Sequence, residues 1–87
     1  MEIQYSRNFI KEFRKCPENI KNSFKIRLSV FIQDEHSPIL KNHILIGKFK
    51  GYSSINITGD WRAIFKAAEN NELIIFTDIG THSKLYS

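Results

Sequence analysis

The spacing of apolar residues changes along the chain, from three or four residues in the first half to about two in the second. Ile3 to Tyr5 alternate as a short strand does. Ser6 can cap a helix, so the pattern after it predicts a helix over residues 7–15. Pro17 suits the first turn of a second helix, which we expect to reach residue 34. The two helices should form an antiparallel hairpin, and the apolar face of the second comprises Ile20, Phe24, Leu28, Phe31 and Ile32.

The second half of the chain reads as strands. After a polar connector that contains Pro38, we predict strands over residues 43–50, 53–58, 61–67 and 73–79, with a turn at 69–72. The last run is almost continuously apolar, which predicts a central strand that Gly80 ends, followed by a tail. The expected fold is α+β: an N-terminal strand, a two-helix hairpin, then a three- to four-stranded, mostly antiparallel sheet that the first strand joins.

Length and composition narrow the classes of protein. Eighty-seven residues make one domain, 1–87, with a thin core. A lone cysteine, Cys16, excludes an internal disulfide, and no cluster of residues has metal-ligand spacing, so we expect neither a metal nor another cofactor. The first residues do not resemble a signal peptide and no segment could span a membrane, so we expect a cytoplasmic protein without a membrane partner. A net charge of +4 suits a nucleic acid or an acidic protein partner.

Polar residues that can carry chemistry gather in the second half of the chain. Cleavage of RNA without a metal needs a base for the ribose 2′-hydroxyl, an acid for the leaving oxygen and a cation for the phosphate. Histidine suits the first two tasks and arginine the third. Each candidate also has a structural interpretation, such as a surface ion pair between Arg62 and Asp60 or Asp78. The candidates are His43, Lys48, Lys50, Asp60, Arg62, His82 and Tyr86.

Three motifs in the second half resemble the RelE/ParE toxin superfamily. They are H-I-L-I-G-K-F-K-G-Y at 43–52, G-D-W-R-A-I-F at 59–65 and F-T-D-I-G-T-H-S-K-L-Y at 76–86. Their order and separation are most similar to the YafQ-like branch. The resemblance implies catalytic roles for His82 as proton donor or acceptor, Arg62 as phosphate clamp, and His43 or Asp60 as base or orienter. It implies contacts with RNA for Lys48, Lys50, Trp61 and Tyr86.

Two positions depart from the family pattern. Asn56 stands where YafQ-like members have a second histidine, and Asp78 stands where they have an arginine on the last strand. We expect Arg62 to supply the missing cation from the neighbouring strand, because cross-strand side chains meet on one face of a sheet.

The resemblance implies the toxin of a type II toxin–antitoxin system. The main hypothesis is a metal-independent endoribonuclease that cuts mRNA on the ribosome and so inhibits translation. One alternative is a ParE-like gyrase poison. Another is a degenerate toxin that only binds its antitoxin and helps to repress the operon. The expected partners are a cognate antitoxin, mRNA on the ribosome and, only through the antitoxin complex, operator DNA.

Overall fold

The computed structural model describes all residues from 1 to 87 and contains a five-stranded sheet in the order β1-β5-β4-β3-β2. The strand β1 pairs with β5 in parallel, and every other pair is antiparallel. The predicted α+β class, with the first strand in the same sheet, is therefore confirmed. The chain runs β1 (Glu2–Tyr5), α1 (Arg7–Arg14), α2 (Glu18–Gln33), β2 (His43–Ile44), β3 (Ser53–Asn56), β4 (Trp61–Ala68), β5 (Leu73–Thr81) and α3 (His82–Tyr86), with 3-10 turns η1 (Pro38–Leu40) and η2 (Gly47–Phe49).

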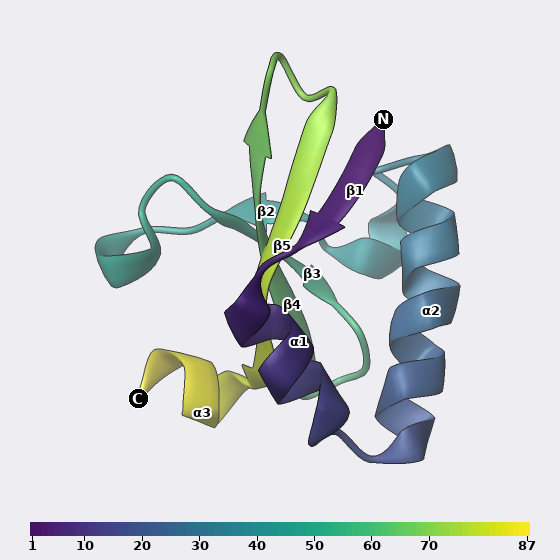
Figure 1. Cartoon of the computed structure of the whole chain (residues 1–87), viewed down its shortest axis with the longest axis vertical. Helices are drawn as coiled ribbons and strands as arrows, with labels where there is room; N and C mark the ends of the chain where they lie inside the picture. Colours follow the sequence, from purple (N-terminus) through teal and green to yellow (C-terminus); the bar gives the residue numbers. More distant parts are fainter.

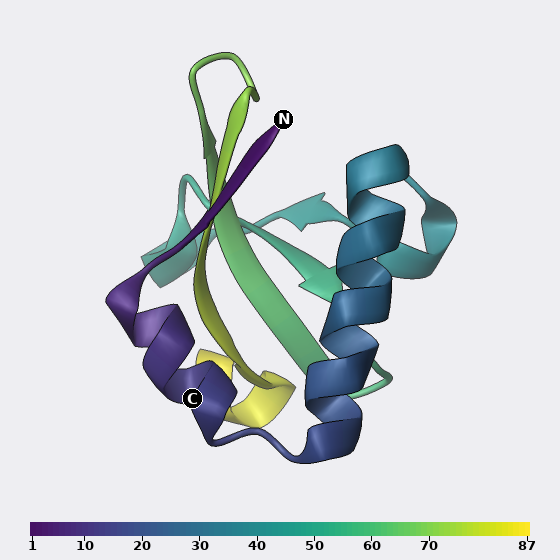
Figure 2. The ribbon, with the colours of Figure 1, turned by 45° about the vertical axis from the view of Figure 1, so that its right-hand side comes forward.

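The sheet separates two unequal layers. Figure 1 shows α2 and η1 on one side of the sheet, and the segment after β2 together with α3 on the other. In Figure 2, α1 and α2 diverge from their short connection and do not lie flat against each other. The predicted antiparallel hairpin is thus an open pair of helices, and its gap is filled by aromatic rings: Phe24 lies 5.3 Å from Phe9 and 5.6 Å from Phe13, between ring centroids.

Local signals set the helix ends where the sequence predicts them. The hydroxyl of Ser6 accepts a hydrogen bond of 3.0 Å from the backbone N–H of Phe9, which is the N-cap contact that starts α1. Pro17 precedes the first residue of α2 and needs no hydrogen-bond donor there. On α2, Ile20, Phe24 and Phe31 are buried, whereas Ile32 is 51% exposed and does not belong to the core face.

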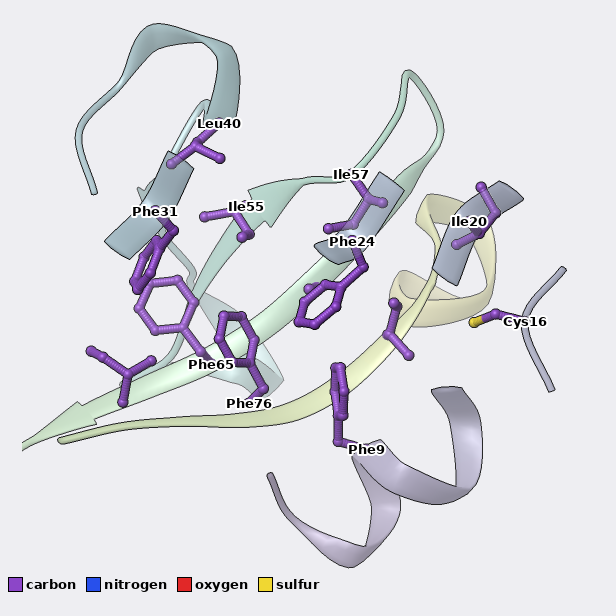
Figure 3. Close-up of a cluster of buried hydrophobic side chains, with 13 residues drawn as sticks. Phe9, Cys16, Ile20, Phe24, Phe31, Leu40, Ile55, Ile57, Phe65 and Phe76 are labelled. Atoms are coloured by element: carbon purple, nitrogen blue, oxygen red, sulfur yellow. The ribbon is translucent and has the colours of Figure 1, made fainter. Parts of the chain in front are cut away.

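The main core lies between the helices and the sheet (Figure 3). Phe76 on β5 is fully buried, and its ring touches Phe9, Phe24, Phe31 and Phe65 at centroid distances from 5.3 to 5.9 Å. Such aromatic contacts let a small number of residues bury a large apolar area. A short chain therefore gains a continuous core from only a few rings.

The segment from 43 to 50 is not the long strand that its alternation predicts. Only His43 and Ile44 pair with β3, because the chain then turns out of the sheet into η2. Gly47 and Gly51 have φ of 68° and 93°, in the left-handed region that glycine tolerates best. The backbone N–H of Leu45 donates a hydrogen bond of 2.9 Å to the carbonyl of Tyr52, so residues 46–51 form a closed loop.

The end of the chain also differs from the prediction. Gly80 does not end the last strand, because it pairs with Arg62 and β5 continues to Thr81. The expected tail is the short helix α3, which Thr81 caps by accepting the Lys84 N–H at 3.3 Å. The turn at 69–72 is confirmed, and its residues Glu69, Asn70 and Asn71 all have positive φ. None of the helices has the length and apolarity needed to cross a membrane.

Candidate active site

A polar pocket of about 260 Å³ opens on the face of the sheet opposite the main core. It brings together residues from three separate elements: β2, β4 and α3. Each element offers one group that can handle a proton or a phosphate. The lining residues are His43, Leu45, Arg62, His82 and Tyr86. The sequence had placed four of these five in the site, with Leu45 as the exception.

Backbone contacts fix the ring of His43. Its Nδ1 lies 2.8 Å from the carbonyl oxygen of Lys41, which can only accept, so Nδ1 carries the hydrogen of the neutral ring. The other nitrogen, Nε2, lies 3.5 Å from the hydroxyl of Ser54, which is fully buried on the paired strand β3. In the neutral ring Nε2 is therefore unprotonated and able to accept a proton.

Arg62 is anchored by the turn between β3 and β4. Its Nη1 donates to the carbonyl oxygens of Gly59 at 3.1 Å, Trp61 at 3.3 Å and Thr58 at 3.4 Å. The surface pair with Asp60 or Asp78, which was the structural alternative for Arg62, does not form, since no carboxylate lies within 4.0 Å of the guanidinium. The positive charge is thus held in place without an acidic partner, and the remaining donors suit a phosphate.

His82 begins α3 and is positioned through the backbone. Its N–H donates to the carbonyl of Asp60 at 2.9 Å, and its ring packs 4.8 Å from that of Tyr86, one turn further along. Gly80 allows this helix to approach, because a β-carbon there would lie 3.3 Å from Cγ of the buried Leu85. The imidazole itself stays exposed, where a substrate can reach it.

Four other predicted residues do not line the pocket. Trp61 packs against the main core on the helix side of the sheet, on the face opposite Arg62. The side chain of Asp60 is exposed, and its link to the site is the carbonyl that holds His82. Lys48 lies at the edge, with Nζ 3.2 Å from the carbonyl of Ser87, and Lys50 is exposed in the loop before Gly51.

The two departures from the family pattern also lie outside the pocket lining. Asn56 is nearly buried opposite Arg62 in the β3–β4 pair, and its carbonyl accepts a hydrogen bond of 3.2 Å from Arg27 of α2. Asp78 is half-buried on β5, and its carboxylate accepts a hydrogen bond of 2.9 Å from the backbone N–H of Ile79. Burial raises the pKa of this carboxyl above its usual value. Arg62 is the cation that the pocket contains.

The sequence did not single out three further side chains on the same face as the pocket: Phe49, Tyr52 and Lys66. The two rings pack over a second small cluster formed by Leu45, Ile64 and Leu85. The strand period of two along β4 could have placed Lys66 on the face of Arg62. Phe49 and Tyr52 stand within the 43–52 motif, but the loop that carries them is not periodic, so the sequence did not assign their side chains to a face.

The pocket therefore combines two imidazoles with a fixed guanidinium, on the sheet face opposite the helical layer. This set can accept a proton, donate a proton and neutralise a phosphate. No group of three or more His, Cys, Asp or Glu side chains is arranged to hold a metal ion.

Comparison with known proteins identifies the family. The family model described as the bacterial toxin of type II toxin–antitoxin systems, YafQ, matches residues 1–87. The chain therefore belongs to the YafQ family of toxins. It is 28% identical to the mRNA interferase toxin YafQ of Escherichia coli K12, over 98% of this chain and 95% of that protein.

Solved structures agree with this assignment. The crystal structure of YafQ from E. coli BL21(DE3) superposes with a TM-score of 0.82 at 26% identity, covering 99% of this chain and 98% of that one. YafQ in the E. coli DinJ–YafQ toxin–antitoxin complex gives 0.79 at 27% identity, covering 99% and 97%. A YoeB/ParE toxin from Agrobacterium tumefaciens shares the fold, with a TM-score of 0.77 at 13% identity over 94% of this chain and 99% of that one.

Proposed function

We propose that this toxin is an mRNA interferase, a ribosome-dependent endoribonuclease that cuts mRNA and stops translation in the cytoplasm. The observation that carries the proposal is the pocket that joins His43, Arg62 and His82. The match of residues 1–87 to the YafQ family and the similarity to the mRNA interferase toxin YafQ of E. coli support it. Residues 1–87 would act as a single toxin domain.

The proposed reaction is transfer of the phosphoryl group to the neighbouring hydroxyl. The ribose 2′-oxygen attacks the adjacent phosphorus, the bond to the 5′-oxygen breaks, and a 2′,3′-cyclic phosphate results. His43 takes the 2′-hydroxyl proton through Nε2, which the bond from Nδ1 to Lys41 leaves unprotonated. His82 gives a proton to the departing 5′-oxygen, and Arg62 neutralises the charge that builds on the phosphate. No step requires a metal.

The remaining predicted residues take supporting roles in this proposal. Asp60 orients His82 through its backbone carbonyl. Tyr86, whose ring packs on that of His82, positions a base, and Lys48 and Lys50 attract the RNA backbone. Trp61 packs against the main core, on the face of β4 opposite Arg62, and so supports the strand that carries Arg62. RNA bound at the pocket would have to pass around the edge of the sheet to contact Trp61.

The proposed partner is an antitoxin with acidic residues on the surface that meets this toxin; the E. coli relative forms a toxin–antitoxin complex with DinJ. The net charge of +4 favours such a partner. Operator DNA would be reached only through that complex.

The test is reconstituted translation followed by primer extension on the mRNA. Wild-type toxin should create new 5′ ends within codons on translated mRNA, and His82→Ala should reduce their rate by about 10²- to 10⁴-fold at an unchanged melting temperature. Lys25→Ala, at an exposed lysine beside the groove between α1 and α2, is the control and should cleave as the wild type does. Translation without cleavage, accompanied by DNA damage in expressing cells, would point to a gyrase poison instead. A folded wild-type protein with neither effect would leave only antitoxin binding.

A further inference from the structure

A row of aromatic rings continues from the pocket along the same face of the molecule. The ring of Tyr86, which packs on His82, lies 5.7 Å from Phe49, and Phe49 lies 6.4 Å from Tyr52, between centroids. The three aromatic side chains are all half-buried, with one part against the second apolar cluster and the other part open to solvent. We name Phe49, Tyr52 and Tyr86 the aromatic row.

Two lysines follow this row. Nζ of Lys48 lies 5.3 Å from the centroid of Phe49, and Nζ of Lys66 lies 5.9 Å from that of Tyr52. Neither lysine pairs with an Asp or Glu side chain. Nζ of Lys48 donates to the main-chain oxygen of Ser87 at 3.2 Å, so Lys66 is the lysine whose charge is free to meet an anion. Lys66 is also four residues after Arg62 on β4, which places the two cations about 13 Å apart along one face of the strand.

Packing explains why the rings cover the second cluster, and attraction to the ring faces explains why the lysines stand over them, but neither requires Lys66 to lack an acidic partner. Leu45, Ile64 and Leu85 are the buried members of that cluster and need only an apolar cover. A line of rings bordered by cations is instead the arrangement that binds single-stranded nucleic acid, because bases stack on the rings while the phosphates meet the charges.

We propose that Phe49, Tyr52 and Lys66 form a binding subsite for the nucleotides of a single RNA strand that flank the bond cut in the pocket. This inference rests on the proposed RNA substrate. Tyr86 joins the subsite to His82, so the strand passes from the pocket over Phe49 to Tyr52, and Lys66 holds a phosphate at the far end. Stacking does not depend on the identity of the base, so the subsite adds affinity without adding sequence preference.

The experiment measures binding and does not require cleavage. The probes are a dinucleotide and a mixed-sequence hexanucleotide in which every 2′-hydroxyl is methylated, so that the nucleophile is blocked. For the wild-type protein, fluorescence anisotropy should show tighter binding of the hexanucleotide. Tyr52→Leu should weaken hexanucleotide binding about tenfold and leave the dinucleotide unchanged. Lys66→Met should lower the slope of log Kd against log salt by about 0.7, the value for one phosphate contact to a single strand.

Two controls make the result specific. Tyr5→Leu and Lys25→Met remove an aromatic residue and a cation from the helix side of the molecule, beside another groove, and should not alter RNA binding. Tyr52→Phe keeps the ring and should retain the hexanucleotide affinity, which separates loss of stacking from loss of folding. Circular dichroism melting checks each variant.

The outcomes separate the subsite from the catalytic proposal. Wild-type protein that binds the hexanucleotide through Tyr52 but never cuts mRNA would keep the subsite and remove the nuclease. Cleavage on ribosomes with equal hexanucleotide affinity in wild type, Tyr52→Leu and Lys66→Met would keep the nuclease and overturn the subsite.

Discussion

The carboxylate of Glu12 on α1 accepts a hydrogen bond of 2.5 Å from Nζ of Lys84 on α3, and this is the only ion pair that joins α3 to another element. Glu12 is only 9% exposed and also accepts from Lys15 at 3.1 Å. Because the bond from Lys84 and then that from Lys15 favour the charged form, the pKa of Glu12 falls to about 2. Lys84 lies two residues after His82, so the pair helps to hold α3, which carries His82, in place.

We predict that Glu12→Gln destabilises the protein at neutral pH and that the difference disappears in acid. The pKa of Glu12 is about 2 in the fold, against 4.5 as the ordinary value, so its charged form contributes stability above pH 4.5. That contribution is lost as the pH falls from 4.5 to about 2. Thermal melting of wild type and variant should differ by a few degrees at pH 7 and converge near pH 2.

Glu18→Gln provides the comparison for this effect. Glu18 pairs with Lys21 at 3.5 Å within α2, but its side chain is 82% exposed, so its loss should change the melting temperature little. Equal melting temperatures of Glu12→Gln and wild type at pH 7 would mean that the link between α1 and α3 contributes nothing to stability.

Asp78→Asn should have the opposite effect on stability. Burial raises the pKa of Asp78, so the folded state favours the protonated carboxyl. The protonated carboxyl therefore contributes to the free energy of unfolding below the unfolded pKa, and this contribution is lost as the pH rises through the folded pKa. An asparagine stays neutral and its oxygen can still accept the Ile79 N–H. Urea unfolding at pH 7 should therefore show a variant at least as stable as the wild type, with the gap closing below pH 4. A variant less stable at pH 7 would show that the charge of Asp78 is itself needed.

Removal of one methyl group should distinguish the core from the exposed edge of the sheet. Ile55 on β3 is fully buried, whereas Ile44 on the neighbouring β2 is 79% exposed. Ile55→Val should lower the free energy of unfolding by about 0.5–1.5 kcal/mol, because it leaves a small cavity. Ile44→Val should change it by less than about 0.5 kcal/mol. Chemical denaturation measures both, and equal losses would contradict the assigned burial.

The helices and the central strands could be predicted from the sequence because local signals and periodicity agree there. Ser6 caps α1 and Pro17 introduces α2, each for a reason that lies in one residue. The alternation of Trp61 to Ala67 matches β4, which ends one residue later. In contrast, the alternation at 43–50 gave a false strand, because the positive φ values at Gly47 and Gly51 turn the chain away from its partner.

The pocket itself could be predicted only as a list of residue types. His43, Arg62 and His82 were candidates from their chemistry and from the family resemblance, but the sequence did not show that they meet. Whether two residues meet depends on the face of the sheet on which each side chain lies. Trp61 and Arg62 are adjacent in sequence but lie on opposite faces. The aromatic row arises from contacts between a loop and α3, more than 30 residues apart, for which no local pattern exists.

The hydrogen bond from His43 to Lys41 makes the proposed base testable by two isosteric variants. Asparagine places its amide near the position of Nδ1 and can keep the bond to the carbonyl, whereas glutamine reaches the position of Nε2, beside Ser54. Neither amide can take a proton at neutral pH. If His43 is the base, both variants should lose about 10²- to 10⁴-fold in mRNA cleavage at unchanged melting temperature. If His43 only orients the substrate through Nε2, glutamine should retain most of the cleavage rate and asparagine should not, which would move the role of base to another group of the pocket.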